Sequence, residues 1–401
     1  MTRKGNLIVA QSGGPTVAIN SSLVGVIHEA LEQEAIGGIY GAQNGIVGVL
    51  EEKLIDLRRV PRQTLEGLRR TPAAALGTVR YKLSDADYER LLEVFRTYHV
   101  RYFLYNGGND SMDTAMRIHQ MARDANYELV SIGIPKTVDN DLVGTDFCPG
   151  YGSAARFVAT AIRDTGYDTE AMAPSSPVKI MEVMGRNVGW LTAASVLARE
   201  SPEDAPHLVY LPERPVSKQT LLSEVETVYR RLGRVVIALS EGARDEKGDL
   251  LGQALQEEVD VFGHRMKGGA ADAIARLITA ELGLKARVDR PNYLQRSFMS
   301  LASPVDLEGA YQVGRAAVKA AVSGQSGNMI ALVRLSSSPY RFKTGTVPLS
   351  EVANRERPLP AEYIDGRTGE ITAAFVEYAR PLIGDPLPPY VRLPVHYVER
   401  P

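Results

Sequence analysis

The chain has 401 residues, of which 44% are hydrophobic and 23% charged, with a formal net charge of -2. This composition is typical of a globular protein of about two domains, and it excludes a disordered chain and a strongly basic nucleic-acid-binding surface. The single cysteine, Cys148, excludes an intrachain disulfide and a thiolate zinc site. No run of about 18 apolar residues occurs, so we expect no membrane span and a cytoplasmic location.

Apolar runs alternate with helical periodicity along the first half of the chain. Residues 6–10 predict a strand, and residues 18–33 predict a helix because Ile19, Leu23 and Ile27 fall on one helical face. The pattern then predicts, in order, a strand at 100–105, a helix at 111–125, a strand at 128–134, a helix at 151–166 and a strand at 178–183.

The second half of the chain continues this alternation. The predicted elements are a strand at 207–211, a helix at 216–233, a strand at 234–239, a helix at 268–283, a strand-like stretch at 286–295 and a strand at 328–335. From about residue 336 the chain is rich in proline and turn residues, and we expect this part to wrap the surface.

Repeated β-α-β units with nearly continuous apolar strands favour parallel sheets that helices cover on both faces. We therefore predict two Rossmann-like three-layer α/β domains with mostly parallel sheets and the active site in the cleft between them. The expected limits are 1–150 and 151–295 for the two α/β domains, with 296–401 as a C-terminal segment that returns to both and ends in a Pro-rich tail. The number of strands also permits a (β/α)₈ barrel, which is the alternative fold.

Glycines and polar residues gather directly after the predicted strands. The runs are QSGGPT at 11–16, NGGNDS at 106–111, PKTVDND at 135–141, MGRNVG at 184–189 and SEGAR at 240–244. Ligands of open parallel sheets bind beyond the carboxyl ends of the strands. These runs therefore predict a single binding cleft.

Two glycine pairs, Gly13 with Gly14 and Gly107 with Gly108, stand between a predicted strand and a predicted helix. Glycines there let backbone N–H groups approach an anion at a positive helix end, although each pair by itself is equally well explained as a tight turn. Neither a Walker motif nor a G-x-G-x-x-G fingerprint is present. Together the pairs favour phosphate binding.

Asp139 and Asp141 are two residues apart, and on extended backbone both would point to the same side. Such a pair could activate a hydroxyl and help to hold Mg²⁺ in phosphoryl transfer, or it could be a turn held by Asx hydrogen bonds. Lys136 could supply charge to a phosphate or be an ordinary surface lysine, while Arg186 and Arg296 could clamp an anion or form structural ion pairs. The residues thus indicate an enzyme that acts on phosphorylated small molecules.

These motifs, in this order, resemble those of the phosphofructokinases over about residues 5–335, and most closely the pyrophosphate-dependent branch. The matching runs are SGGPTVAIN, LGTVR, GGNDS, PKTVDND, MGR, SEG and YLQR. The resemblance implies reversible, pyrophosphate-dependent phosphorylation of fructose 6-phosphate at its 1-hydroxyl, giving fructose 1,6-bisphosphate and phosphate. An ATP-dependent 6-phosphofructokinase and a non-catalytic paralogue are the alternatives.

The resemblance also implies residue roles. Asp139 would be the general base, and the catalytic residues would be Asp139, Lys136, Thr137 and Arg186. The first domain would bind the donor through Gly13, Gly14, Arg80, Gly108, Asn109, Asp110 and Lys136. The second would hold the sugar phosphate, whose ligands would be Thr137, Asp139, Met184, Gly185, Arg186, Glu241, Arg287, Tyr293 and Arg296. Mg²⁺ would be the cofactor, held by Asn109, Asp110 and Asp141.

Three further implications concern the donor, the metal and the assembly. ATP-using members carry glycine at the positions of Asp110 and Lys136, so bulk and charge at these two positions favour pyrophosphate over the nucleotide. Asn109 stands where an aspartate is usual. Arg287 matches an arginine that reaches across a subunit interface, which implies a homodimer or homotetramer with small-molecule substrates and neither nucleic acid nor membrane as a partner.

Overall fold

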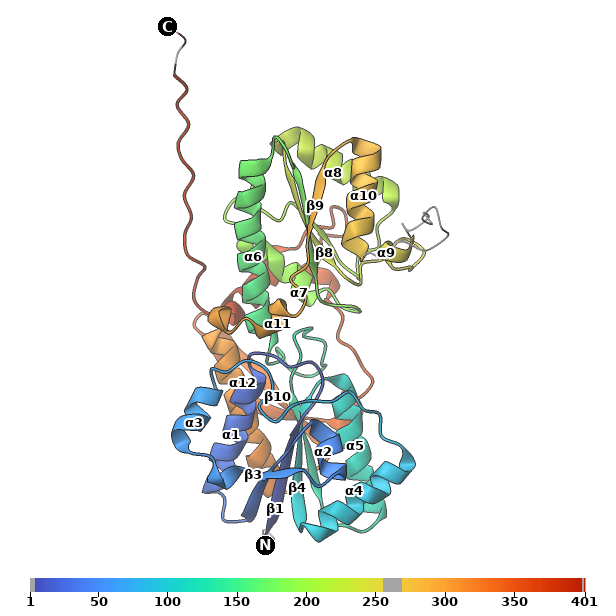
Figure 1. Ribbon diagram of the computed structural model, residues 1–401, viewed down its shortest axis with the longest axis vertical. Helices are drawn as coiled ribbons and strands as arrows, with labels where there is room; N and C mark the ends of the chain where they lie inside the picture. Colours follow the sequence, from blue (N-terminus) through green and yellow to red (C-terminus); the bar gives the residue numbers. More distant parts are fainter. Residues whose placement is uncertain (1–3, 255–268, 399, 401) are drawn as a thin grey trace.

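The computed structural model describes residues 4–254, 269–398 and 400, and it forms two lobes, each built on its own sheet (Figure 1). The first lobe has a seven-stranded sheet in the order β11-β10-β5-β4-β1-β2-β3, and the second has a four-stranded sheet in the order β7-β8-β6-β9. Two open, mostly parallel sheets confirm the predicted pair of α/β domains. The (β/α)₈ alternative is wrong, because the described strands close no barrel.

Helices cover both faces of the sheet in the first lobe (Figure 1). Its strands are β1 Gly5–Gln11, β2 Ile36–Ala42, β3 Leu54–Asp56, β4 Val100–Gly107, β5 Val130–Pro135, β10 Asn328–Ser337 and β11 Tyr340–Pro348. Its helices are α1 Ile19–Glu32, α2 Gly45–Leu50, α3 Arg62–Leu68, α4 Asp85–Thr97, α5 Asn109–Asp124, α12 Pro304–Val322 and α13 Leu349–Val352. Among the described strand pairs of this sheet, β2–β3 and β10–β11 are antiparallel and the others are parallel.

The alternation of side chains along β1 explains these three layers. Leu7 and Val9 belong to the core beneath α1 and α12, whereas Ile8 and Ala10 belong to the core beneath α2, α4 and α5. From Leu7 to Gln11 every residue of this strand is therefore buried, as expected for a strand in the middle of a parallel sheet.

The second lobe repeats the plan on a smaller, fully parallel sheet. Its strands are β6 Val178–Val183, β7 Leu208–Tyr210, β8 Val235–Ser240 and β9 Ala286–Asp289. Its helices are α6 Tyr151–Met172, α7 Trp190–Ala193, α8 Lys218–Leu232, α9 Leu251–Ala254, α10 Ala270–Leu282, α11 Leu294–Ser297 and α14 Ala373–Ala379. In Figure 1, α6 lies on one face of the sheet and α8 and α10 lie on the other.

The predicted elements differ from the observed ones in several places. The strand-like stretch at 286–295 ends at Asp289, after which the chain enters α11, and the expected start of the helix at 268 lies outside the described residues. Several elements were not predicted at all, among them β2, α4 and α12. The region after residue 336 does more than wrap the surface, because β11 pairs with β10 in the first sheet. The domain limits at 150 and 295 stay a prediction.

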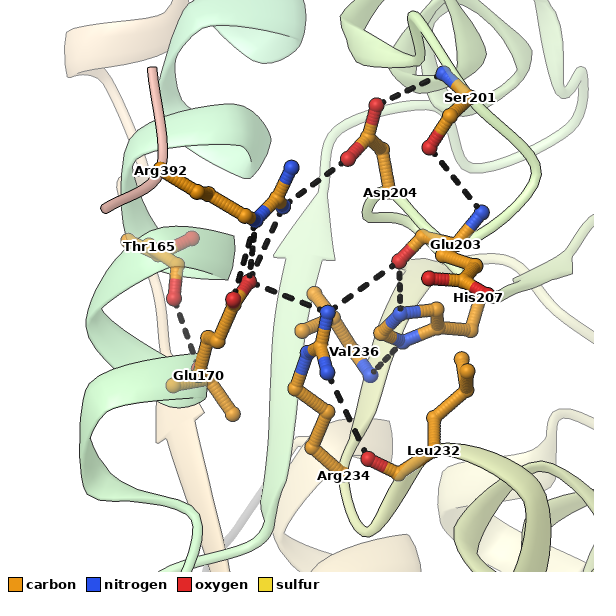
Figure 2. Close-up of polar contacts among 11 residues, drawn as sticks. Thr165, Glu170, Ser201, Glu203, Asp204, His207, Leu232, Arg234, Val236 and Arg392 are labelled. Atoms are coloured by element: carbon orange, nitrogen blue, oxygen red, sulfur yellow. Dashed lines mark hydrogen bonds and ion pairs between the residues drawn. The ribbon is translucent and has the colours of Figure 1, made fainter. Parts of the chain in front are cut away.

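The C-terminal tail is fixed to the second lobe by a cluster of charged side chains (Figure 2). The Arg392 guanidinium donates to both carboxylate oxygens of Glu170 at 3.0 and 3.1 Å and to Asp204 Oδ1 at 3.0 Å. Arg234 shares Glu170 at 3.0 Å. The coloured part of the C-terminal tail extends away from the two lobes (Figure 1). Tyr397 is 92% exposed.

Within the described part of the chain, no helix is both long and apolar enough to cross a membrane.

Candidate active site

The predicted site residues of the first lobe follow three neighbouring strands. β5, β4 and β1 are adjacent in the sheet, with Gly107 opposite Pro135. Backbone hydrogen bonds continue this order into the loops, since Ser12 N–H donates to Asn106 at 2.8 Å and Lys136 N–H donates to Gly107 at 3.0 Å. The loops after the three strands therefore lie side by side.

Lys136 is a buried cation at the junction of these loops. Its side chain is only 3% exposed, and Nζ donates to the Gly14 carbonyl at 2.8 Å. A Cβ atom on Gly13, whose φ is +71°, would lie 3.2 Å from that Nζ. Burial and then the positive charge of Arg296 lower the pKa of Lys136 to about 8. The alternative of a surface lysine is wrong.

The segment Asp139-Asn140-Asp141, which we call the catalytic turn, follows a bend at Val138 and Asp139, and it is closer to the turn that was one of the two alternatives than to regular extended backbone. Asn140 has a φ of +57°, in the left-handed region that asparagine tolerates better than most residues. Its side chain fixes the turn, because Oδ1 accepts from the Cys148 backbone N–H at 2.9 Å and Nδ2 donates to the Tyr378 hydroxyl at 2.9 Å. A residue with left-handed backbone therefore separates the two carboxylates.

Both carboxylates are held in a low-dielectric environment. Burial, followed by the negative charges of Asp141 and Glu241, raises the pKa of Asp139 to about 7, while Lys136 acts in the opposite direction. Burial also raises the pKa of Asp141. The Oδ1 atoms of Asp139 and Asp141 are buried and have no hydrogen-bond partner among the described residues. A carboxylate with such a pKa can accept a proton near neutral pH.

The predicted sugar-phosphate residues of the second lobe follow β6 and β8. Glu241 Oε1 accepts from the Gly185 N–H at 3.3 Å, and Ser240 Oγ donates to the Gly185 carbonyl at 2.6 Å. Gln295 Oε1 accepts from the Met184 N–H at 3.0 Å. These hydrogen bonds all involve backbone groups of Met184 and Gly185, so they fix the main chain of the loop. Gly185 has a φ of +128°, which glycine adopts readily.

Arg296 joins the loops of the two lobes. Its carbonyl accepts from the Val17 N–H at 2.9 Å, and its Nη1 would lie 2.4 Å from a Cβ atom on Gly14. The guanidinium stacks 4.2 Å from the centre of the Tyr293 ring. Burial lowers the pKa of Arg296, and the nearby positive charge of Arg80 adds to this effect. Because the positive charges of Arg80, Arg296 and Lys136 repel one another, an anionic ligand bound near them would be favoured.

The remaining predicted residues lie at the surface or in the turns. Arg80, Asp110, Arg186, Glu241, Arg287 and Tyr293 are exposed. Gly108 caps α5, and Thr137 Oγ1 accepts from the Asp139 N–H at 3.1 Å. Arg287 Nε lies 3.5 Å from Ser176 Oγ on the same chain, so a role across a subunit interface stays a prediction.

Asn109 is placed differently from the other residues predicted to bind the metal. Its Oδ1 accepts from the Asn354 N–H at 2.7 Å, and its Nδ2 donates to the Arg355 carbonyl at 2.5 Å. No group of three acidic, histidine or cysteine side chains within the described ranges could hold a metal by itself. Mg²⁺ commonly takes only one or two carboxylates and completes its shell with water and substrate phosphates, and the unpartnered carboxylate oxygens of Asp139 and Asp141 fit that need.

Sequence reasoning missed two residues that shape this site. Asp306 is fully buried at the start of α12 and accepts from the backbone N–H groups of Gly150 at 2.8 Å and Ser153 at 3.1 Å. The sequence feature that could have revealed Asp306 is the helix N-cap at Ser303. The Ser303 hydroxyl accepts from the Asp306 N–H at 3.3 Å. Arg357 binds the catalytic turn, but no local motif marks it. The buried ammonium of Lys136, the buried carboxylate oxygens of Asp139 and Asp141, and the exposed charged residues of the second lobe are the groups expected of a phosphotransferase.

Comparison with known proteins gives the family. A phosphofructokinase family model matches residues 6–289. The chain is 43% identical to a pyrophosphate--fructose 6-phosphate 1-phosphotransferase of Xanthomonas campestris pv. campestris, covering 97% of this chain and 96% of that protein. The crystal structure of a pyrophosphate-dependent phosphofructokinase from Marinobacter aquaeolei matches with a TM-score of 0.86 and 40% identity over 96% of this chain and 94% of that one. The chain belongs to the phosphofructokinase family, which confirms the resemblance.

Proposed function

We propose that this protein transfers a phosphoryl group reversibly from pyrophosphate to the 1-hydroxyl of fructose 6-phosphate. The observation that carries the proposal is the buried Lys136 ammonium, which donates to Gly14 in the glycine loop at 11–16, while the Lys136 backbone N–H donates to Gly107 in the donor loop at 106–111. A small polyanion such as pyrophosphate can be stabilised by that positive charge. A nucleotide is larger and would need the space that the lysine side chain occupies beside the glycine loop. Relatives at 43% and 42% identity over nearly the whole chain are named for this reaction.

Asp139 is the general base in this proposal. Its pKa of about 7 lets it take the proton of the sugar hydroxyl as the oxygen attacks the phosphorus atom. Lys136, Arg80 and Arg296 offset the negative charge of the two phosphorylated substrates. Such a transfer depends mainly on positioning and charge neutralisation, with little covalent chemistry for the protein to perform.

A divalent metal is general for phosphoryl transfer in this family. We propose Mg²⁺, held by Asp141 together with pyrophosphate oxygens and water, where it would neutralise charge on the transferred group. The predicted ligands Asn109 and Asp110 lie in the first turn of α5, and the amide of Asn109 is already hydrogen-bonded. We further propose a cytoplasmic homo-oligomer in which Arg287 of a second subunit reaches the sugar 6-phosphate.

The choice of donor tests the proposal. Purified protein is mixed with fructose 6-phosphate and Mg²⁺ and given either pyrophosphate or ATP, and fructose 1,6-bisphosphate is measured. We expect product from pyrophosphate at a kcat/KM at least about 100-fold above that for ATP. The Asp139→Asn variant is the matched control and should bind fructose 6-phosphate but turn over about 10²–10⁴-fold more slowly. Faster turnover with ATP would refute the assignment of the donor.

A further inference from the structure

A short segment near the C-terminus, Asn354-Arg355-Glu356-Arg357, crosses the loops of the proposed site. Asn354 and Arg355 hold the side chain of Asn109 at the start of α5. Glu356 forms a β-bridge with Leu142, next to the catalytic turn. We call this segment the strap. It connects the donor loop with the catalytic turn although it lies more than two hundred residues away in the chain.

Arg357 makes the most extensive contacts of the strap. Its Nε and Nη2 donate to the Asn140 carbonyl at 3.1 and 2.8 Å, and its Nη1 donates to the Thr145 and Asp146 carbonyls at 2.6 and 3.1 Å. Its backbone N–H donates to the Asp141 carbonyl at 2.7 Å. The acceptors are all backbone carbonyls of the catalytic turn and the loop that follows it, so the guanidinium fixes the path of the main chain.

The guanidinium is itself held from the second lobe. It stacks 4.5 Å from the centre of the Trp190 ring, and Trp190 Nε1 donates to the Arg357 carbonyl at 2.9 Å. The planar fork of an arginine can bind several acceptors at once, which a lysine cannot do. Stacking on a buried aromatic ring limits the rotation of this fork.

The catalytic turn needs such support because its geometry is unusual. Asn140 has left-handed backbone between the two carboxylates, and its carbonyl receives two of the Arg357 bonds. Without the guanidinium, the carbonyls of the buried residues Asn140 and Thr145 would lose hydrogen-bond partners, and the turn could relax. A shift of about 1 Å in a reacting group can cost about 100-fold in rate.

We infer that Arg357 is a positioning residue that holds the Asp139-Asn140-Asp141 turn in its reactive geometry through the backbone carbonyls. Its side-chain hydrogen bonds go to backbone carbonyls of the turn and of the loop that follows, so in this inference it acts on the reaction through the turn. This inference deepens the proposed function and rests on it.

The test compares Arg357→Ala with Arg163→Ala in the full-length protein. Arg163 is a matched control, because it also donates to a C-terminal carbonyl, that of Pro388 at 2.8 Å, and stacks 4.1 Å from the Tyr390 ring. We expect kcat of Arg357→Ala to fall about 10–100-fold, while KM for both substrates stays within about threefold. Arg163→Ala should keep the kcat of the wild type even if its melting temperature falls.

Chemical rescue separates positioning from general stability. Low millimolar guanidinium chloride should restore part of the kcat of Arg357→Ala, because the free cation can occupy the vacated place, and it should not raise the kcat of the wild type or of Arg163→Ala. Arg357→Lys keeps the charge but not the fork, so it should remain slow. A folded Arg357→Ala variant with a kcat within about twofold of the wild type would overturn the inference, as would full activity of Arg357→Lys.

Hydrogen exchange gives an answer that does not depend on the reaction. Peptides covering residues 137–150 should exchange faster in Arg357→Ala than in the wild type, with exchange elsewhere unchanged. Unchanged exchange in these peptides would overturn the inference even if the wild type is active. If the wild type forms no product from pyrophosphate, the proposed function fails, while the exchange result still decides the role of Arg357.

Discussion

The acid–base behaviour of the site depends on two buried residues with opposite charges. Burial raises the pKa of Asp139 to about 7 and lowers that of Lys136 to about 8, since each is moved toward its neutral form. Asp139 is a base only above its pKa, and Lys136 is a cation only below its own. Asp139 is therefore deprotonated and Lys136 protonated together only over a narrow interval of pH.

This interval predicts a bell-shaped pH dependence. We expect kcat/KM with pyrophosphate to rise as the pH passes about 7, where Asp139 loses its proton, and to fall as it passes about 8, where Lys136 loses its own. Initial rates between about pH 6 and about pH 9, with melting temperatures at each pH as the control, check this. A flat profile would show that neither group limits the reaction.

The choice between pyrophosphate and ATP should depend on two side chains, Asp110 and Lys136. In Asp110→Gly/Lys136→Gly, the buried ammonium and the exposed carboxylate are both removed, so we expect ATP turnover to appear while kcat/KM for pyrophosphate falls at least about 100-fold. Asp110→Gly alone, which leaves Lys136 on the Gly14 carbonyl, serves as the matched control and should still favour pyrophosphate. ATP kinetics that do not change in the double variant would place the block elsewhere.

The sequence indicated where the proposed site residues stand relative to the strands, but not the local backbone that holds them. The positions of Lys136 and Asp139 after a strand were visible because strand ends in parallel sheets meet at one edge. The left-handed backbone at Asn140 was not visible, because it depends on Tyr378 and Arg357, which are remote in sequence. The amide of Asn109 is likewise engaged by the strap rather than by a local partner.

Among the elements, α12 was missed because its packing depends on small residues. It lies against α1 so closely that a Cβ atom on Gly314 would be 2.1 Å from the Ser22 carbonyl oxygen, and one on Gly25 would be 2.2 Å from that of Tyr311. A helix that packs through glycine and alanine shows little hydrophobic periodicity, which is the signal on which such predictions depend.

Two glycine-to-alanine changes should have opposite effects on the free energy of unfolding, because one lies at the close contact of α1 with α12 and the other lies in open space on α3. Gly314→Ala should lower the free energy of unfolding by about 1–3 kcal/mol, because the new methyl group meets backbone that cannot move aside. Gly67→Ala, in α3 with nothing within 4 Å of the new Cβ, should raise it by about 0.5–1 kcal/mol through helix propensity. Urea unfolding measures both, and equal effects of the two changes would contradict this account.

At the scale of the whole molecule, the two α/β units were predictable and the path of the chain between them was not. Each β-α-β unit has a local pattern, but pairing of Asn328 with Ile132 in the first sheet leaves no local trace. For the same reason, the predicted surface wrap after residue 336 does not include β11 as a strand of the sheet. Nothing in the proline-rich sequence after residue 336 indicates which sheet it joins.

We expect the C-terminal tail to contribute to stability up to Arg392 and to contribute little beyond it. Deleting residues 393–401 should change the melting temperature by less than about 1 °C, because Leu393, Val395 and Tyr397 are exposed. Arg392→Ala should lower the free energy of unfolding by about 1 kcal/mol, since it breaks a bidentate pair with Glu170. Thermal and urea unfolding measure these effects. A larger loss from the deletion than from Arg392→Ala would contradict this division.

The strap has a consequence for how the enzyme is made. The catalytic turn lies near residue 140, but the guanidinium that fixes it is contributed at residue 357, and β10 completes the neighbouring edge of the sheet only from residue 328 onward. During synthesis, the early loops therefore emerge long before the parts that order them. A chain that ended before the strap would carry every motif of the active site and still lack its working form, so we expect competence only after residue 357 has been synthesised.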